Sequence, residues 1–162
     1  MHKMTLELAK SLIAAAEQKA RELGLASDIA IVDDGGNLVA FHRMDNARIA
    51  GIVISQDKAW TSVAMKMPTA NLAQAAAPGG PSFGINTTNN GRLVILGGGI
   101  PLVKDKVVIG GIGVSGGTSA QDIEVANAAV QAFESKRDLG GSQLGTVRIG
   151  TGYIGYPVYP QQ

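Results

Sequence analysis

The chain has 162 residues, a length typical of one domain, and its 14 lysines and arginines nearly balance 13 aspartates and glutamates. This balance excludes the strongly basic surface that general binding to nucleic acids or membranes requires. Cysteine is absent, which excludes disulfides, thiolate zinc sites and a cysteine nucleophile. No apolar run reaches the ~18 residues of a membrane helix, and Glu7 and Lys10 interrupt the N-terminal segment, so we expect a cytoplasmic protein.

The first part of the chain predicts a helix followed by a hairpin. Thr5 can cap a helix that starts at Leu6, and Gly24 provides a stop after it. Residues 29–33 and 38–42 are two apolar runs joined by a turn rich in aspartate, glycine and asparagine. This pattern is typical of a β-hairpin.

Two helices are expected next. The first runs from Ala50 to Met65 and is ended by Pro68, and the second is a short alanine-rich helix over 70–77 that Thr69 can cap. The spacing of apolar residues predicts one buried side for the longer helix, formed by Val53, Ala59, Trp60, Val63 and Met67.

The third part of the chain is rich in glycine, with 12 of the 22 glycines between residues 79 and 117. Two strands are expected in it, over 93–96 and 107–114. Thr118 and Gln121 then form a capping-box pattern that opens a final helix. Hairpins build antiparallel sheets, so the order of elements predicts an α+β domain with helices on an antiparallel sheet, and not a doubly wound parallel sheet.

The composition changes near Ser135. Residues 139–162 carry one charged side chain and all three tyrosines of the chain. We therefore expect a domain over 1–134 and a glycine- and tyrosine-rich tail over 135–162. The tail is either a disordered terminus or an arm that packs on a neighbouring subunit, because tyrosine supplies amphipathic contact area.

A strand that ends in glycines and leads into a helix is a candidate anion site. The residues that would contact a carboxylate, phosphate or propionate are Ser115, Gly116 and Gly117, next to the positive end of the final helix. No Lys-Ser/Thr follows, which excludes a P-loop, and the βαβ context of a dinucleotide fingerprint is missing. The alternative is that these glycines allow sharp turns and close packing.

A second glycine run, Gly97–Gly99, is also a candidate for ligand contact. Each glycine in a regular element costs about 0.5–1 kcal/mol relative to alanine, so a run of three is tolerated where backbone must approach something closely. Gly98 and Gly99 would then face a ligand, or simply another strand.

Three charged side chains are candidates for a polar pocket. Arg43 and Asp45 follow the second strand and are expected on one side, either as a pocket rim or as a surface ion pair worth about 0–1 kcal/mol. Lys58 lies between apolar neighbours in a helix. If it is buried it needs a partner, such as an acidic substrate or Asp45, and otherwise it belongs to a solvated helix face.

The two histidines, His2 and His42, form no cluster, and no H-x-x-x-H spacing occurs. A zinc site made by protein ligands alone is therefore not expected. A single histidine can still be an axial haem ligand.

Several segments together resemble the GlcG/HbpS family, which includes the C-terminal domain of PduO-type corrinoid adenosyltransferases. The resemblance runs in order through residues 3–134. At Asp105-Lys106 the chain departs from the Asp-Gly usual in the family, which affects one hairpin turn. The segments are MTLELA (4–9), AIVDDGGNLVAFHRMD (30–45), SQDKAWT (55–61), GGGIPL (97–102), GGIGVSGGT (110–118) and QD (121–122).

The resemblance implies a profilin-like fold, assembly into homo-oligomers such as octamers, and binding of haem or a cobalamin-type tetrapyrrole. Arg43, Lys58 and the turn Ser115–Gly117 would then hold the acidic side groups of the ligand. Haem ligation varies between family members, so the resemblance assigns no iron ligand, and His42 is a candidate because the chain has few possible ligands.

Three functions follow as hypotheses. The first is a protein that binds a small acidic ligand, namely haem or a related tetrapyrrole. The second is an enzyme or accessory protein acting on a small carboxylate or carbonyl metabolite in a catabolic pathway, with Lys58, Asp45 and Arg43 as its polar groups. The third is an assembly or chaperone subunit without catalysis.

Overall fold

The computed structural model describes residues 3–139. Its helices and strands follow one another along the chain in the order that the hairpins and helices of the sequence predict, except in the segment before the third strand. They are α1 (Leu6–Glu22), β1 (Asp28–Asp33), β2 (Leu38–Arg43), α2 (Ala50–Met65), α3 (Thr69–Ala75), the 3₁₀ turns η1 (Ile85–Thr87) and η2 (Asn89–Gly91), β3 (Gly99–Lys104), β4 (Val107–Ser115) and α4 (Ser119–Leu139).

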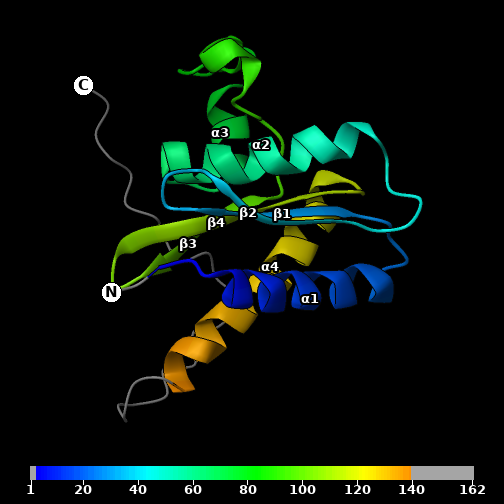
Figure 1. Ribbon diagram of the computed structural model, residues 1–162. Helices are drawn as coiled ribbons and strands as arrows, with labels where there is room; N and C mark the ends of the chain where they lie inside the picture. The colour runs from blue at the N-terminus through cyan, green and yellow to red at the C-terminus, as the bar shows by residue number, and fades with distance from the viewer. Residues whose placement is uncertain (1–2, 140–162) are drawn as a thin grey trace.

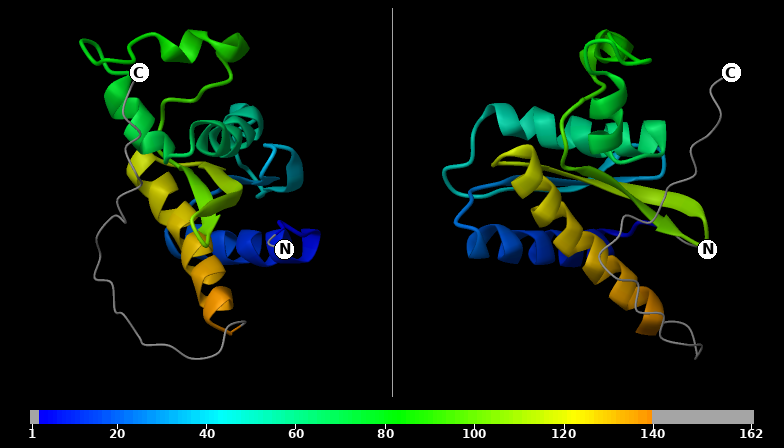
Figure 2. Two further views of the ribbon diagram at one scale, coloured as in Figure 1. Left: turned by 90° about the vertical axis from the view of Figure 1, so that its left-hand side faces the viewer. Right: turned by 180° about the vertical axis from the view of Figure 1, so that it is seen from behind.

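The four strands form one antiparallel sheet in the order β2-β1-β4-β3. Helices α1 and α4 lie on one face of the sheet, and α2 lies on the other with α3 beyond it (Figure 1). The two further views show the same three layers, with α4 crossing the sheet obliquely (Figure 2). The expected single α+β domain with an antiparallel sheet is confirmed.

The larger core lies between the sheet and the helix pair α1 and α4. Thr5 Oγ1 accepts the N–H of Leu8 at 3.1 Å, which confirms the predicted cap of α1. The buried side of α1 meets Ile29 and Ile31 of β1 in this core. Burial of an aliphatic side chain of this size contributes about 1.5–3 kcal/mol. The buried residues of α1 are Ala9, Leu12, Ile13, Ala16 and Ala20.

The opposite face of the sheet differs because α2 lies very close to it. A Cβ on Gly113 of β4 would overlap the backbone oxygen of Ser55 in α2. Most of the α2 side chains buried at this distance are small, and the prediction of a large apolar side for α2 is wrong at Val53, which is 61% exposed, and at Trp60, which is only partly buried. The buried residues of α2 are Gly51, Ser55, Lys58, Ala59, Thr61, Ser62 and Val63.

The strand expected over 93–96 is wrong. The N–H of Val94 donates to Thr61 Oγ1 at 3.0 Å, so this stretch runs along α2 instead of joining the sheet. The strand begins six residues later as β3, after Gly98 turns the chain with a φ of 125°. The predicted turn at Asp105-Lys106 is confirmed, and both residues adopt left-handed φ angles between β3 and β4.

The predicted bounds of α2, Ala50 to Met65, are confirmed, but the left-handed Lys66 ends the helix before the chain reaches Pro68. Two other boundaries differ from the prediction. Pro68 is the N-cap of α3, and the hydroxyl of Thr69 bonds to Gly99 instead of capping that helix. Helix α4 continues past residue 134 to Leu139. The rest of the predicted tail lies outside the described residues, and within 3–139 no helix is long and apolar enough to cross a membrane.

Candidate functional site

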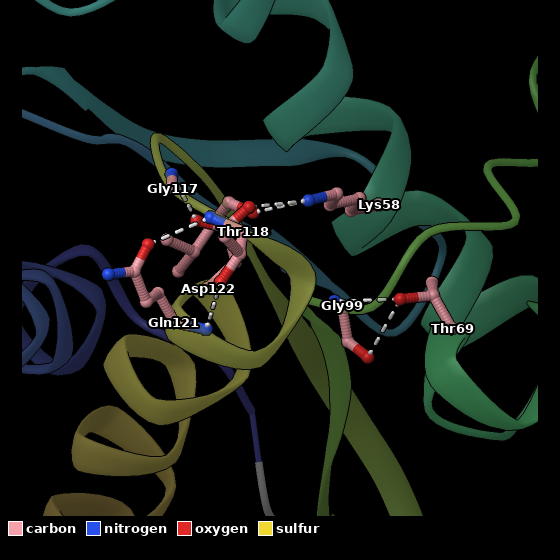
Figure 3. Close-up of polar contacts among 8 residues, drawn as sticks. Lys58, Thr69, Gly99, Gly117, Thr118, Gln121 and Asp122 are labelled. Atoms are coloured by element: carbon pink, nitrogen blue, oxygen red, sulfur yellow. Dashed lines mark hydrogen bonds and ion pairs between the residues drawn. The ribbon is translucent and has the colours of Figure 1, made fainter.

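The two glycine runs meet around the side chain of Lys58, between α2, β4 and the start of α4. Lys58 is only 2% exposed, and its Nζ donates to the backbone oxygen of Val114 at 2.8 Å. Nζ also donates to Asp122 Oδ2 at 3.1 Å, which makes a buried ion pair (Figure 3). Burial lowers the pKa of Lys58, and the charge and hydrogen bond of Asp122 oppose that shift.

Asp122 fills the position at the start of α4 where an anion was expected. Its Oδ1 accepts the N–H of Gly117 at 2.8 Å, while Oδ2 holds Lys58. Thr118 and Gln121 exchange two further bonds, from Thr118 N–H to Gln121 Oε1 at 2.9 Å and from Gln121 N–H to Thr118 Oγ1 at 3.2 Å (Figure 3). The predicted capping box is confirmed, and these donors at the helix start already have partners within the chain.

The predicted ligand contacts Gly98 and Gly99 also face protein. A Cβ on Gly98 would lie 2.7 Å from the oxygen of Val114 and 3.0 Å from Lys58 Nζ. The N–H of Gly99 donates to Thr69 Oγ1 at 2.9 Å (Figure 3). The space beside Gly98 is therefore occupied by β4, α4 and the side chain of Lys58, and the space beside Gly99 by α2 and α3.

The turn after β4 is packed in the same way. A Cβ on Gly116 would lie 2.7 Å from the oxygen of Ala26, and one on Gly117 would lie 2.5 Å from Gln121 Oε1. Ser115, the last residue of β4, is partly exposed. The alternative interpretation of the glycines, close packing, describes what these residues do in the chain.

The polar groups predicted to share a pocket do not meet. The guanidinium of Arg43 donates to the backbone oxygen of Ala47, through Nε at 3.3 Å and Nη2 at 3.2 Å. Asp45 lies after the end of β2 and is exposed, so strand alternation no longer sets its side. The partner of Lys58 is Asp122 and not Asp45.

His42 and Arg43 are neighbours in β2 and point to opposite faces of the sheet. His42 pairs with Ile29, whose side chain packs toward α1. Its Nδ1 meets Glu17 Oε1 of α1, and Glu17 Oε2 accepts from Arg21 Nη2 at 3.3 Å. The side chain of His42 is 52% exposed. It therefore stands on the surface, away from Lys58.

Sequence reasoning missed two buried aspartates. Asp122 was noted only as part of a short family-like segment, although an acidic residue in the first turn of a helix is a recognisable signal. Asp28 begins β1, is 0% exposed, and neither of its carboxylate oxygens has a hydrogen-bond partner among the described residues. Asp28 is the first residue of an apolar strand, and no local pattern predicts that a carboxylate at this position is buried.

A family model described as "Haem degrading protein HbpS-like" matches residues 4–131. The chain belongs to the HbpS-like family. The family resemblance stated from the sequence segments is thereby confirmed, and the match ends before the last turns of α4.

Three relatives illustrate the range of this HbpS-like family. The uncharacterized 15.0 kDa protein in the dhaT-dhaS intergenic region of Citrobacter freundii is 39% identical over 130 residues, covering 80% of this chain and 92% of the relative. The corrinoid adenosyltransferase PduO of Citrobacter freundii is 37% identical over 122 residues, covering 75% of this chain but 36% of PduO. The crystal structure of a PduOC:heme complex is 34% identical, with a TM-score of 0.78, covering 81% of this chain and 95% of that one.

Proposed function

We propose that this protein binds haem or a related tetrapyrrole. The observation that carries the proposal is its likeness, over 95% of the neighbour's chain, to the structure of a haem complex. The likeness to PduO keeps a cobalamin-type ligand as the alternative within the same ligand class. A cytoplasmic location stays part of the proposal, and fractionation of the source cells checks it.

The residues around His42 suit an iron ligand. Glu17 engages Nδ1 of the ring, which leaves Nε2 as the nitrogen that can bind a metal. A carboxylate on the other ring nitrogen fixes the orientation of a ligating histidine and raises its basicity. Arg21 holds the second oxygen of Glu17 and brings a cation close to the ring, which suits a haem propionate.

Bound haem would supply an iron centre whose redox and ligand chemistry belongs to the cofactor. The chain's own contribution would be to orient and hold it. His42 is half-exposed, so haem bound there would lie against the outside of the protomer. A neighbouring subunit could cover its other side, and we therefore include a homo-oligomer, up to an octamer, in the proposal. The exposed side chains of Ile49, just before α2, and of Val53 in α2 supply apolar surface for contacts between subunits.

Binding ranks ahead of catalysis on a small carboxylate or carbonyl compound. The enzyme hypothesis needs Lys58, Asp45 and Arg43 to converge on a substrate. In the described chain Lys58 is buried with Asp122, Asp45 is exposed, and Arg43 is held by Ala47. Nothing in this arrangement favours a shared reaction centre.

Hemin titration tests the proposal. Wild-type protein should show a shifted Soret band that saturates at a fixed stoichiometry. His42→Ala should weaken binding at least about tenfold, equal to about 1.4 kcal/mol, and change the spectrum of any haem that still binds. His2→Ala, which removes the other histidine, is the matched control and should behave as wild type.

Each outcome has its own meaning. A wild-type protein without a Soret shift or without saturation would rule out haem as the ligand, and corrinoids would be titrated next. Unchanged binding and an unchanged spectrum in His42→Ala would remove His42 as the iron ligand while leaving haem binding intact. Light scattering on the same samples measures the assembly, and a monomer with and without hemin would contradict the oligomer.

A further inference from the structure

Asp28 is a buried residue whose carboxyl group has no hydrogen-bond partner in the described chain. Both oxygens of Asp28 and the hydroxyl of Ser27 are buried without a hydrogen-bond partner among the described residues. Burying an ionised carboxylate without partners costs so much free energy that such a group usually takes up a proton instead. Asp28 therefore needs an explanation that packing alone does not provide.

Each element around Asp28 can be named. Its cross-strand partners are Arg43 of β2 and Ser115 of β4, so these three side chains share one face of the sheet. The first turn of α2 lies over that row, where a Cβ on Gly51 would overlap Asp28 Oδ2 and lie 3.3 Å from Ser115 Oγ. The start of α2 thus closes directly onto the carboxyl group.

The charges facing Asp28 are few. Arg43 is the charged side chain whose field acts on it, but its guanidinium hydrogen-bonds to Ala47 and forms no ion pair with Asp28 among the described residues. Residues 50–53 of α2 carry no ionisable side chain, and within residues 3–139 no side chain caps the start of this helix. Ser115 and Ser27, the residue before Asp28, contribute hydroxyl groups only. The positive end of α2 is the remaining favourable partner for an ionised carboxylate.

Burial raises the pKa of Asp28, and the positive charge of Arg43 opposes that shift only in part. Because the pKa of Asp28 is raised when the start of α2 lies on it, protonation of Asp28 favours the structure in which α2 is in place. Its contribution is fully present below the ordinary carboxyl pKa and is lost as the pH rises through the raised pKa.

We propose that Asp28 is a proton-operated latch: its neutral carboxyl group lets the start of α2 lie on the sheet, and its ionisation releases residues 44–53. Release would admit water to the buried carboxyl group of Asp28, which lies between Arg43 and Ser115, two residues that the sequence predicts as ligand contacts. The proposal concerns the opening of this end of the sheet and does not depend on haem binding at His42.

Hydrogen exchange of the full chain tests the latch. Protection of residues 44–55, corrected for the intrinsic exchange rate, is measured between about pH 4 and pH 8. Wild-type protein should lose protection progressively with rising pH in this segment, while α1 stays protected. Asp28→Asn cannot ionise and should keep the segment protected throughout. Asp45→Asn removes an exposed carboxyl group in the same segment and should behave as wild type.

Two results would overturn the latch. One is wild-type protection of residues 44–55 that does not change with pH, and the other is an equal loss of protection in Asp28→Asn. The side-chain carboxyl carbon of Asp28, followed by NMR in the wild-type protein, gives a readout that needs no variant to fold. Its titration should lie above the range usual for an aspartate carboxyl group, and titration within or below that range would contradict the proposal.

Discussion

Asp122 and Asp28 are both buried next to α2, at 3% and 0% exposure, yet their surroundings differ completely. Asp122 receives Lys58 on one oxygen and the N–H of Gly117 on the other. Asp28 receives no hydrogen bond from the described chain. The first carboxylate joins elements together, whereas the second is a source of pH sensitivity. The aspartate with hydrogen-bond partners thus lies next to the glycine-rich part of the sequence, whereas the aspartate without partners begins an ordinary apolar strand.

The largest expected effect comes from removing the buried ion pair between Lys58 and Asp122. Lys58→Met should lower the free energy of unfolding by about 3–5 kcal/mol, because it leaves Asp122 buried without its counter-charge. Urea unfolding measures the change.

A double variant sharpens this result. Lys58→Met combined with Asp122→Asn removes both charges and keeps an oxygen that can accept the N–H of Gly117. It should be more stable than Lys58→Met alone. If the single variant lost no stability, or if the double variant were the less stable of the two, the ion pair would not hold this region together.

A smaller effect is expected from the packing of glycine against α2. Gly113→Ala should lower the free energy of unfolding by about 1–3 kcal/mol, since the new methyl group meets the backbone of Ser55 and can only push the helix away. Thermal unfolding measures it. Gly24→Asn is the control, because a Cβ there meets nothing within 4 Å and asparagine tolerates the left-handed φ of 70°. Equal losses in the two variants would contradict the close approach of α2.

Local signals in the sequence predicted most of the fold. Thr5, Gly24 and the capping box at Thr118 and Gln121 mark helix ends through interactions made within a few residues, and they are found as expected. The strand at 93–96 failed because Val94 bonds to Thr61, a partner more than thirty residues away that no local pattern announces.

The candidate site was predicted less well, for a related reason. Glycines before and after strands suit both ligand contact and helix packing, and the difference depends on whether α2 comes close. Lys58 was identified as a residue that needs a partner if buried, but its partner is Asp122, which lies 64 positions along the chain. Asp28 was missed because burial of the first residue of a strand depends on what covers that end of the sheet, here Gly51.

The comparison of the two aspartates can be tested by one pair of variants at one neutral pH. Asp122→Asn should lower the free energy of unfolding by about 3–5 kcal/mol, since Lys58 loses its counter-charge. Asp28→Asn should raise it by about 1–2 kcal/mol, because a neutral amide is easier to bury than an unpartnered carboxylate, and this gain should shrink as the pH falls. Opposite signs for the two substitutions are the predicted result, and a loss of stability in both would contradict the account.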